Sequence, residues 1–305
     1  MKFKFLLWTL PLLASVSGCG FKDAGIEYPS KRVLFTYQQY NRQVVVGEGL
    51  GIGIGFVFAG LPANDRDRIV RYAVDPSLVT GDRRTPLPED YYRLGNPSEI
   101  TIPKGQFKAY MSLTVDSAKF VNDPKALTGE YVIPLRIVDA DADEISPGKE
   151  YTMISLSYQG RQYGNYTYSG QRTIEPTGEV EKYGNEPSQT NSIRQLQTVA
   201  ADRFRIYADQ TGTNDPAKGK FSMIITVPVN GGGKVTVEPD TGFLKDVHVH
   251  PDGESVYDES TRTFTLRYRY ILDGVLYRAV DTMKFRNRIR DDQGDGRVLY
   301  EWRGF

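Results

Sequence analysis

The sequence predicts an all-β protein, an immunoglobulin-like β-sandwich followed by an antiparallel β-barrel (lipocalin-like) or a second sandwich. Apolar and polar residues alternate in short segments between residues 32 and 158. No helical pattern longer than two turns occurs there, and the one short helical stretch that the pattern suggests is Ser117–Phe120. The 30 glycines and 17 prolines indicate many turns. The 20 tyrosines favour strands over helices.

The length and charge of the chain restrict its organisation and its partners. At 305 residues and 39% hydrophobic composition, we expect two domains with real cores, at residues 31–158 and 163–305. Lys plus Arg equals Asp plus Glu at 38 each, so the chain has no basic excess for binding nucleic acid phosphates. The sequence therefore predicts no nucleic acid partner.

Residues 1–18 have the pattern of a signal peptide. A basic start is followed by an apolar run, Phe5 to Val16, that is too short to span a bilayer. The next residues, Val16-Ser17-Gly18-Cys19, resemble the lipobox of bacterial lipoproteins. That resemblance implies that Cys19 is acylated on its sulfur, carries palmitate-type chains and becomes the mature N-terminus. The alternatives are an ordinary secretory signal or a buried free thiol.

A lipid anchor would place the mature chain at a membrane. Gly20 follows Cys19 where an Asp would resemble the inner-membrane retention signal, so we expect an outer-membrane protein, lipid-anchored and displayed on the cell surface. Residues 19–30 form a polar tether. The sole cysteine excludes an internal disulfide, and removal of two lysines with residues 1–18 leaves a net charge of about −2.

Glycines at positions 47, 49, 51, 53 and 55 suggest at first a phosphate-binding loop. Such a loop needs a helix start directly after it, whereas Phe56-Val57-Phe58 continues a strand pattern and Pro62 follows. We therefore expect the glycines to share one strand face against which a neighbour packs closely.

The strongest hairpin lies in the second half of the chain. In Thr263 to Leu272, large apolar residues alternate with Thr and Arg, Asp273-Gly274 gives a tight turn, and Val275 to Phe285 returns. One apolar face and one polar face predict the wall of a curved sheet or barrel.

Four ordered blocks resemble the N-terminal sandwich module of Bacteroidota surface lipoproteins. They are residues 74–79 (VDPSLV), 87–92 (LPEDYY), 100–105 (ITIPKG) and 131–135 (YVIPL). Residues 80–84 (TGDRR) replace the Tyr-Asn pair usual after the first block. The second half resembles the barrel-like domain that often follows this module. The resemblance implies a protein associated with glycan uptake that binds glycans or mediates adhesion, beside other surface proteins of such a system.

Two aromatic clusters have the composition of a sugar-binding platform, in which flat rings contact sugar CH groups and polar side chains bind the hydroxyls. The first cluster is Arg161, Tyr163, Tyr166 and Tyr168, and the second contains Tyr300 and Trp302. Alternatively, these residues pack in a core, because Tyr166 and Tyr168 share one strand face.

Metal sites receive weaker support. Asp139, Asp141, Asp143 and Glu150 have part of a calcium-loop spacing, but Glu144 stands where the loop needs glycine, and a solvated turn is the better interpretation. His248 and His250 would need a third ligand from elsewhere. We therefore expect no cofactor.

The sequence contains no catalytic motif with a specific spacing. We therefore expect a non-catalytic protein that binds glycans or glycoproteins. A surface adhesion or pilus-like structural protein is the rival hypothesis, and a glycoside hydrolase is the third, because two carboxylates suffice for that chemistry.

Overall fold

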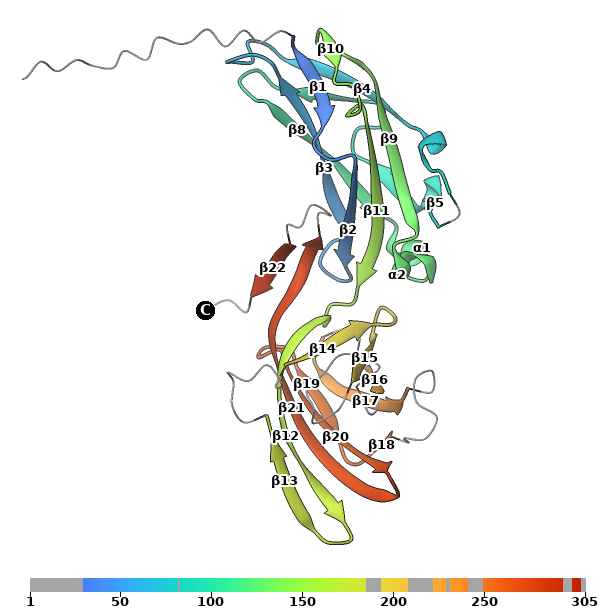
Figure 1. The fold of residues 1–305 in the computed structure, drawn as a ribbon, viewed down its shortest axis with the longest axis vertical. Helices are drawn as coiled ribbons and strands as arrows, with labels where there is room; N and C mark the ends of the chain where they lie inside the picture. Colours follow the sequence, from blue (N-terminus) through green and yellow to red (C-terminus); the bar gives the residue numbers. More distant parts are fainter. Residues whose placement is uncertain are drawn as a thin grey trace, which may run out of the picture.

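The fold is that of a computed structural model, which describes residues 30–81, 83–184, 193–207, 222–228, 231–240, 249–292 and 298–302. These residues form three β-sheets and a few short helices, so the predicted all-β fold is confirmed. Figure 1 shows the first two sheets at one end of the molecule and the third sheet at the other.

The first sheet forms one layer of the sandwich. Its order is β10 (Glu144–Ile145), β1 (Arg32–Phe35), β3 (Gly51–Ala59), β8 (Lys108–Val115) and β6 (Tyr92–Leu94). Every second residue of β8 is buried, as expected for a strand with one face in the core and one in solvent.

The second sheet packs against the first. Its order is β2 (Gln39–Val45), β11 (Tyr151–Gln159), β9 (Tyr131–Ala140), β4 (Arg68–Val74) and β7 (Glu99–Ile102), and β5 (Thr85–Pro86) also pairs with β9. Three pairs of strands in the sandwich, β1–β10, β2–β11 and β5–β9, are parallel. β2 crosses over from β1 instead of forming a hairpin, so its direction need not oppose that of β11.

Short helices connect the strands of the sandwich. They are η1 (Pro76–Leu78), η2 (Glu89–Tyr91), α1 (Ser117–Phe120) and α2 (Lys125–Thr128). The Asp116 carboxylate caps α1 by accepting a hydrogen bond of 3.1 Å from the Lys119 backbone N–H, and Phe120 is buried in the sandwich core. The short helical stretch expected at residues 117–120 is present.

The glycine-rich segment forms a shorter strand face than expected. Gly51, Gly53 and Gly55 lie on the outer face of β3, whereas Gly47 and Gly49 precede the strand with φ of 81° and 86°. Glycine adopts this left-handed conformation without the steric cost that a Cβ imposes. The strand alternation therefore begins only after the turn that joins β2 to β3.

The third sheet closes on itself. Around the ring its strands are β12 (Gly164–Glu175), β14 (Ile193–Thr198), β15 (Arg203–Tyr207), β16 (Ser222–Thr226), β17 (Gly233–Pro239), β19 (Ser255–Asp258), β20 (Thr263–Leu272) and β21 (Val275–Asp292). β12 pairs with β21 and completes an eight-stranded antiparallel barrel. Three further strands pair outside this ring, β13 (Glu179–Tyr183), β18 (Val249–Pro251) and β22 (Val298–Trp302).

The predicted hairpin is the β20–β21 pair. Asp273 and Gly274 both have positive φ, 52° and 77°, as the tight hairpin turn requires. Phe264, Leu266 and Tyr268 are almost completely buried in the barrel core. The predicted division into an apolar face and a polar face is therefore confirmed for this hairpin.

A buried carboxylate inside the barrel binds three tyrosines. Asp281 has no exposed surface, and its Oδ2 accepts hydrogen bonds from the hydroxyls of Tyr168 (2.6 Å) and Tyr268 (2.5 Å). Its Oδ1 accepts one from the hydroxyl of Tyr183. Burial raises the pKa of Asp281 above its usual value, although the three hydrogen bonds oppose that shift.

A charged contact between residues that are far apart in sequence joins the sandwich and the barrel. Arg288 of β21, 1% exposed, donates from Nη2 to both carboxylate oxygens of Glu48 at 2.6 Å, and from Nη1 to the backbone oxygen of Arg161 at 3.1 Å. Arg161 in turn pairs with Glu259 at 2.7 Å. This end of β21 reaches the sandwich near β2 (Figure 1). The contact restrains the barrel relative to the sandwich.

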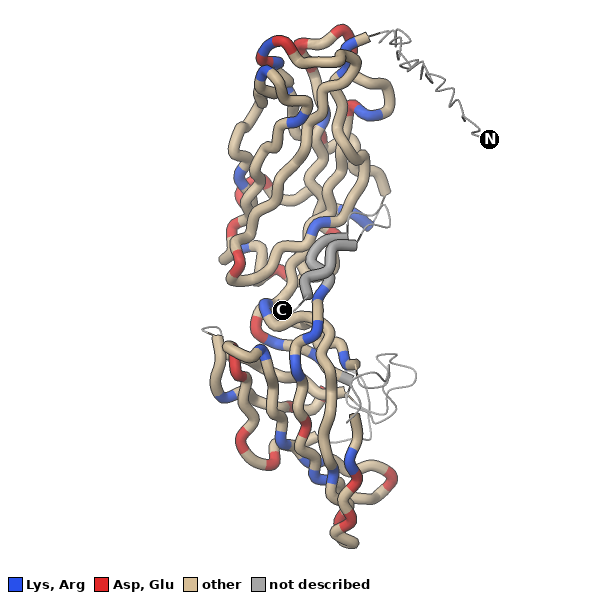
Figure 2. The backbone as a smooth tube through the Cα atoms, turned by 90° about the vertical axis from the view of Figure 1, so that its left-hand side faces the viewer, with Lys and Arg blue, Asp and Glu red and all other residues tan. Residues whose placement is uncertain are grey.

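Charged residues of both signs are interspersed along the two halves of the molecule (Figure 2). This distribution agrees with the balanced composition of the sequence. Within the residues that the structure describes, no helix is long and apolar enough to cross a membrane.

We expect the stability advantage of the wild-type protein over an Asp281→Asn variant to grow as the pH falls from 7 toward 4. The raised pKa means that the folded protein binds the Asp281 proton more tightly than the unfolded chain does. The resulting stabilisation is complete below the unfolded pKa of about 3.9 and is lost as the pH rises through the folded pKa. Urea unfolding of both proteins across this range measures the difference, and a pH-independent difference would contradict the prediction.

Arg288→Ala should lower the free energy of unfolding by about 1–3 kcal/mol, because it leaves the Glu48 carboxylate and the Arg161 carbonyl without their buried donor. Exposed Arg269 on β20 provides the control, since Arg269→Ala should change stability by less than about 0.5 kcal/mol. Small-angle X-ray scattering should also detect a wider spread of sandwich-to-barrel orientations in Arg288→Ala. Equal stability of the two variants would show that the contact does not restrain the molecule.

Candidate binding site

A pocket of about 220 Å³ opens at the edge of the sandwich, where the chain crosses from the first sheet to the second. β1 ends at Phe35 and β2 begins at Gln39. β1 pairs with β3 only over residues 56–59, so among the described strands none pairs with β3 on that side at Gly53 and Gly55. The pocket lies beside this gap in the sheet.

Four aromatic side chains line the pocket, Phe35, Tyr37, Tyr40 and Tyr110. Phe35 and Tyr40 are buried in the sandwich core, and the half-buried ring of Tyr37 lies 5.8 Å from that of Tyr40 between centroids. Tyr110 differs from them because it projects from the outer face of β8 and is 68% exposed. It is therefore the lining ring that is most accessible to a ligand.

The glycines of β3 determine how the Tyr110 ring lies. Gly55 is the cross-strand partner of Tyr110, and a Cβ added at Gly55 would be 3.3 Å from both Tyr110 Cε1 and Thr36 Oγ1. A Cβ added at Gly53 would lie 3.8 Å from Tyr110 Cδ1. The ring therefore lies against a strand surface without side chains, which is the close packing that the glycine spacing predicts.

A buried hydroxyl reaches the pocket from the second sheet. Thr152 of β11 lines the pocket and has no exposed surface. Its Oγ1 has no hydrogen-bond partner among the described residues. Leaving such a group unsatisfied costs about 1–3 kcal/mol, so a ligand or water that bonds to it recovers that free energy.

Arg42 of β2 and Lys108 of β8 are the charged residues of the lining. Arg42 is half-buried, and Lys108 is exposed and makes no ion pair with any described residue. No Asp or Glu belongs to the lining. Of these two cations, Arg42 already has an interaction within the protein, and Lys108 is the one exposed to solvent.

The first predicted sugar platform does not fit the structure. Tyr166 is completely buried between Phe264 and Phe285, with ring centroids 5.6 Å from each, and its hydroxyl donates to the Gln162 backbone oxygen at 2.7 Å. Tyr168 is 3% exposed. Both rings point into the barrel, so the prediction is corrected in favour of the alternative, a buried pair on one strand face.

The other members of that cluster are also engaged in contacts within the protein. Tyr163 is half-buried, and its hydroxyl accepts a hydrogen bond of 3.3 Å from Gln195 Nε2. Arg161 is exposed but forms the ion pair with Glu259. The four residues therefore do not form one exposed platform.

Tyr300 and Trp302 lie on β22, where Trp302 pairs with Asn287 of β21. Their side chains are outside the described part of the structure, so the second predicted platform stays a prediction. Cys19 and His248 also lie outside the described residues, and His250 is exposed on β18.

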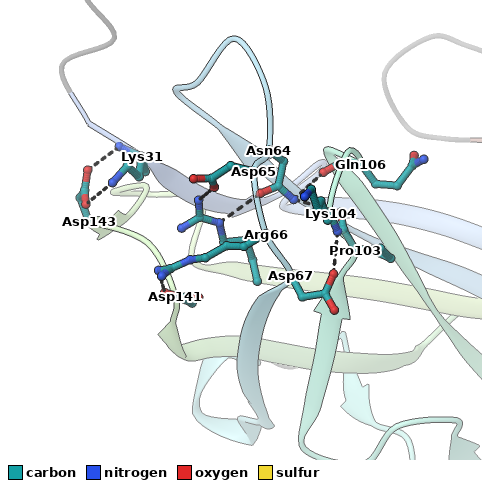
Figure 3. A network of polar contacts seen from close by, with 11 residues as sticks. Lys31, Asn64, Asp65, Arg66, Asp67, Pro103, Lys104, Gln106, Asp141 and Asp143 are labelled. Carbon is teal, nitrogen blue, oxygen red and sulfur yellow. Dashed lines mark hydrogen bonds and ion pairs between the residues drawn. The ribbon is translucent and has the colours of Figure 1, made fainter.

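The acids with calcium-loop spacing bind separate cations of the protein. Asp141 pairs with Arg66 at 2.6 Å, and Asp143 accepts a hydrogen bond of 2.9 Å from the Lys31 backbone N–H (Figure 3). Asp139 pairs with Arg71, also at 2.6 Å. Across the described ranges, no three metal-ligating side chains come together, so these contacts give no support to a calcium site.

The pocket between the sheets was not predicted from the sequence. One signal for it was present, because Tyr110 alternates with Met111, Leu113 and Val115, which face the core, and therefore had to face outward. Thr152 gave no such signal, since its approach to the pocket depends on how β2 crosses between the sheets.

Two family models match the sequence. One describes an N-terminal domain and matches residues 27–144, which include β1 to β10. The other describes a C-terminal domain and matches residues 153–284, from within β11 into β21. The pocket is lined largely by residues of the first match.

The solved structures that match the chain include proteins from Bacteroides. A Bacteroides ovatus protein of unknown function is 18% identical with a TM-score of 0.67, and the match covers 90% of this chain and 99% of that one. A second protein of unknown function from this organism is 16% identical, with a TM-score of 0.48 and coverage of 89% and 100%. An auxiliary nutrient binding protein of Bacteroides thetaiotaomicron is 14% identical, with a TM-score of 0.44 and coverage of 83% and 92%.

At these identities the likeness concerns the fold, and it rests on the first structure. No curated protein matches the sequence. The two family matches nevertheless follow one another along most of the chain. Residues 27–144 therefore belong to the first of these domain families and residues 153–284 to the second.

Proposed function

We propose that the protein is a non-catalytic surface protein that binds glycans or glycoproteins. The observation that carries the proposal is the pocket, where the exposed Tyr110 ring lies near the buried and unsatisfied Thr152 hydroxyl. Sugars bind through apolar CH faces that stack on aromatic rings and through hydroxyls that need polar partners. The pocket offers both kinds of contact.

The chemistry of the lining supports binding over hydrolysis. Cleavage of a glycosidic bond usually needs two carboxyl groups on opposite sides of that bond. The residues that line this pocket include no Asp, Glu, His or Cys. A sugar held here would meet hydrogen-bond donors and an aromatic ring, and no acid or base to break its linkage.

Residues 1–19 support a location of the protein at the outer membrane. We infer that Cys19 carries the lipid that anchors the protein in the outer membrane, with the domains outside the cell beside other proteins of a glycan-uptake system. The lipobox-like sequence before Cys19 supports the anchor. The resemblance of the four sequence blocks supports the uptake role.

Adhesion through a sheet edge is the second candidate function. Residues 51–55 of β3 pair with β8 on one side, and no described strand pairs with them on the other. An unpaired strand edge can accept a strand from another protein. The experiment that follows distinguishes the two functions.

A polysaccharide array probed with the chain from residue 20 onward should show saturable binding that Tyr110→Ala weakens about tenfold or more, because the variant loses the stacking ring. Ile271→Ala removes another exposed apolar side chain, 47% exposed, from the barrel and serves as the control. Single sites are expected to be weak, so the protein is presented in multivalent form.

The other possible outcomes of the array would favour a different site or a different function. Binding lost in Trp302→Ala and kept in Tyr110→Ala would place the site on β22 instead of in the pocket. Absence of binding to every polysaccharide would favour adhesion, and release of free sugar would favour an enzyme.

Cys19→Ala should remove the protein from the membrane fraction and block its lipid-dependent processing, because the acylated sulfur is then absent. Fractionation and labelling with a radioactive fatty acid measure both effects. An unlabelled wild-type protein, or a Cys19→Ala variant that stays in the membrane with unchanged processing, would contradict the anchor.

A further inference from the structure

A second pocket, of about 560 Å³, lies at the end of β8 beside the edge strand β6. This volume falls within the range of about 300–1,000 Å³ that is typical of ligand sites. Glu89 and Asp90 of η2 line one side, and Asp116 and Lys119 at the start of α1 line another. The Lys119 ammonium joins η2 to α1, because it donates hydrogen bonds to the Asp90 carboxylate at 2.7 Å and to the Asp90 backbone oxygen at 3.2 Å.

The polar lining of this pocket can accept hydrogen bonds as well as donate them. The carboxylates of Glu89, Asp90 and Asp116 are acceptors, whereas Arg93 and Lys119 are donors. Neither Glu89 nor Arg93 makes an ion pair or a side-chain hydrogen bond with any described residue, so both groups remain for a ligand. A sugar hydroxyl both donates and accepts, and it matches this mixture. An anionic sugar would face three carboxylates.

β8 connects this pocket with the exposed ring of Tyr110. Tyr110, Ser112 and Thr114 alternate with buried residues and therefore share the outer face of the strand. Thr114 lines the second pocket, and its cross-strand partner on β6 is Arg93, which also lines it. At about 3.4 Å per residue, the four positions from Tyr110 to Thr114 span about 14 Å. That distance is longer than one sugar ring, so a ligand that reaches both points needs several consecutive units.

The surface midway between the two points has almost no side chains. Ser112 of β8 pairs with Gly53 of β3 on one side, and on the other its backbone oxygen accepts a hydrogen bond of 2.8 Å from the Gly95 backbone N–H. The Tyr110 ring lies against the glycines of β3 and is 68% exposed, so its other face is open to solvent. A chain of sugars could therefore lie flat across this face without meeting a bulky side chain.

We propose that the first sheet binds a linear, uncharged glycan along its outer face, with one sugar ring on Tyr110 and a later unit in the pocket beside β6. Glu89 and Arg93 hydrogen-bond to the hydroxyls of that later unit. This inference rests on the proposed glycan-binding function and specifies the class of glycan and a second point of contact. Because both contacts belong to one ligand, the affinity rises once the chain is long enough to reach both.

The test compares short and long oligosaccharides of the same linkage. The chain from residue 20 onward, which contains every described strand, is titrated by calorimetry with dimers and hexamers of the cello, xylo, manno and malto series. Polygalacturonate and chondroitin sulfate serve as acidic comparisons. For at least one neutral series, we expect the hexamer to bind about tenfold or more tightly than the dimer.

Arg93→Ala should lower the affinity for that hexamer to about the affinity for the dimer and leave binding of the dimer at Tyr110 unchanged. Glu89→Gln should weaken the hexamer in the same way, whereas Tyr110→Ala should weaken both ligands. Arg269→Ala, a change of an exposed arginine on β20 of the barrel, is the matched control and should affect neither.

Other outcomes would overturn the extended site. A hexamer that binds no more tightly than the dimer, with a loss in Tyr110→Ala alone, would overturn it and leave the glycan-binding function standing. Equal losses for dimer and hexamer in Arg93→Ala would also overturn it, because the whole ligand would then lie in one pocket. Tighter binding of an acidic polymer than of every neutral ligand would overturn the uncharged class. Absence of binding to every probe would overturn both proposals.

Discussion

Each strand of this protein has to place one face in an apolar core and the other toward solvent, and most of the structure depends on that constraint. Successive side chains of a strand point to opposite sides, so a tyrosine is buried or exposed according to its position in the alternation. Tyr166 and Tyr168 fall in register with the barrel core. Tyr110 falls out of register with its buried neighbours in β8 and remains 68% exposed. Tyrosines therefore stabilise the core in one sheet and are available for ligand binding in another.

The same constraint explains how much of the fold could be predicted. The β20–β21 hairpin was predictable because alternation over ten residues and the Asp273-Gly274 turn are both local in sequence. The parallel pairing of β2 with β11 was not, since it joins residues more than a hundred positions apart that have no local signal. Closure of the barrel through β12 and β21 was likewise left open between a barrel and a sandwich, because a strand pattern is the same in both.

The candidate site was harder to predict than the fold because its parts come from separate strands. The sugar-binding site was predicted at aromatic clusters that are contiguous in sequence. Aromatic neighbours on one strand face, however, usually pack in the same core. The pocket instead combines Tyr110 of β8, Thr152 of β11 and Arg42 of β2, which come together only after two sheets have formed. The Glu48–Arg288 contact, whose partners are 240 positions apart in the sequence, is another example of chemistry that only the tertiary structure reveals.

The position of the pocket between two sheets also bears on how it would bind. Its lining residues lie on strands and on one short crossing, so most of them are held by backbone pairing before a ligand arrives. Preorganisation of this kind lowers the entropic cost of binding, although a small pocket with one exposed ring limits the affinity of a single site. Many copies anchored on one membrane would engage repeated units of the same polymer together and raise the overall affinity without new contacts. A small pocket held by strands is therefore suited to a polymer that presents the same unit many times.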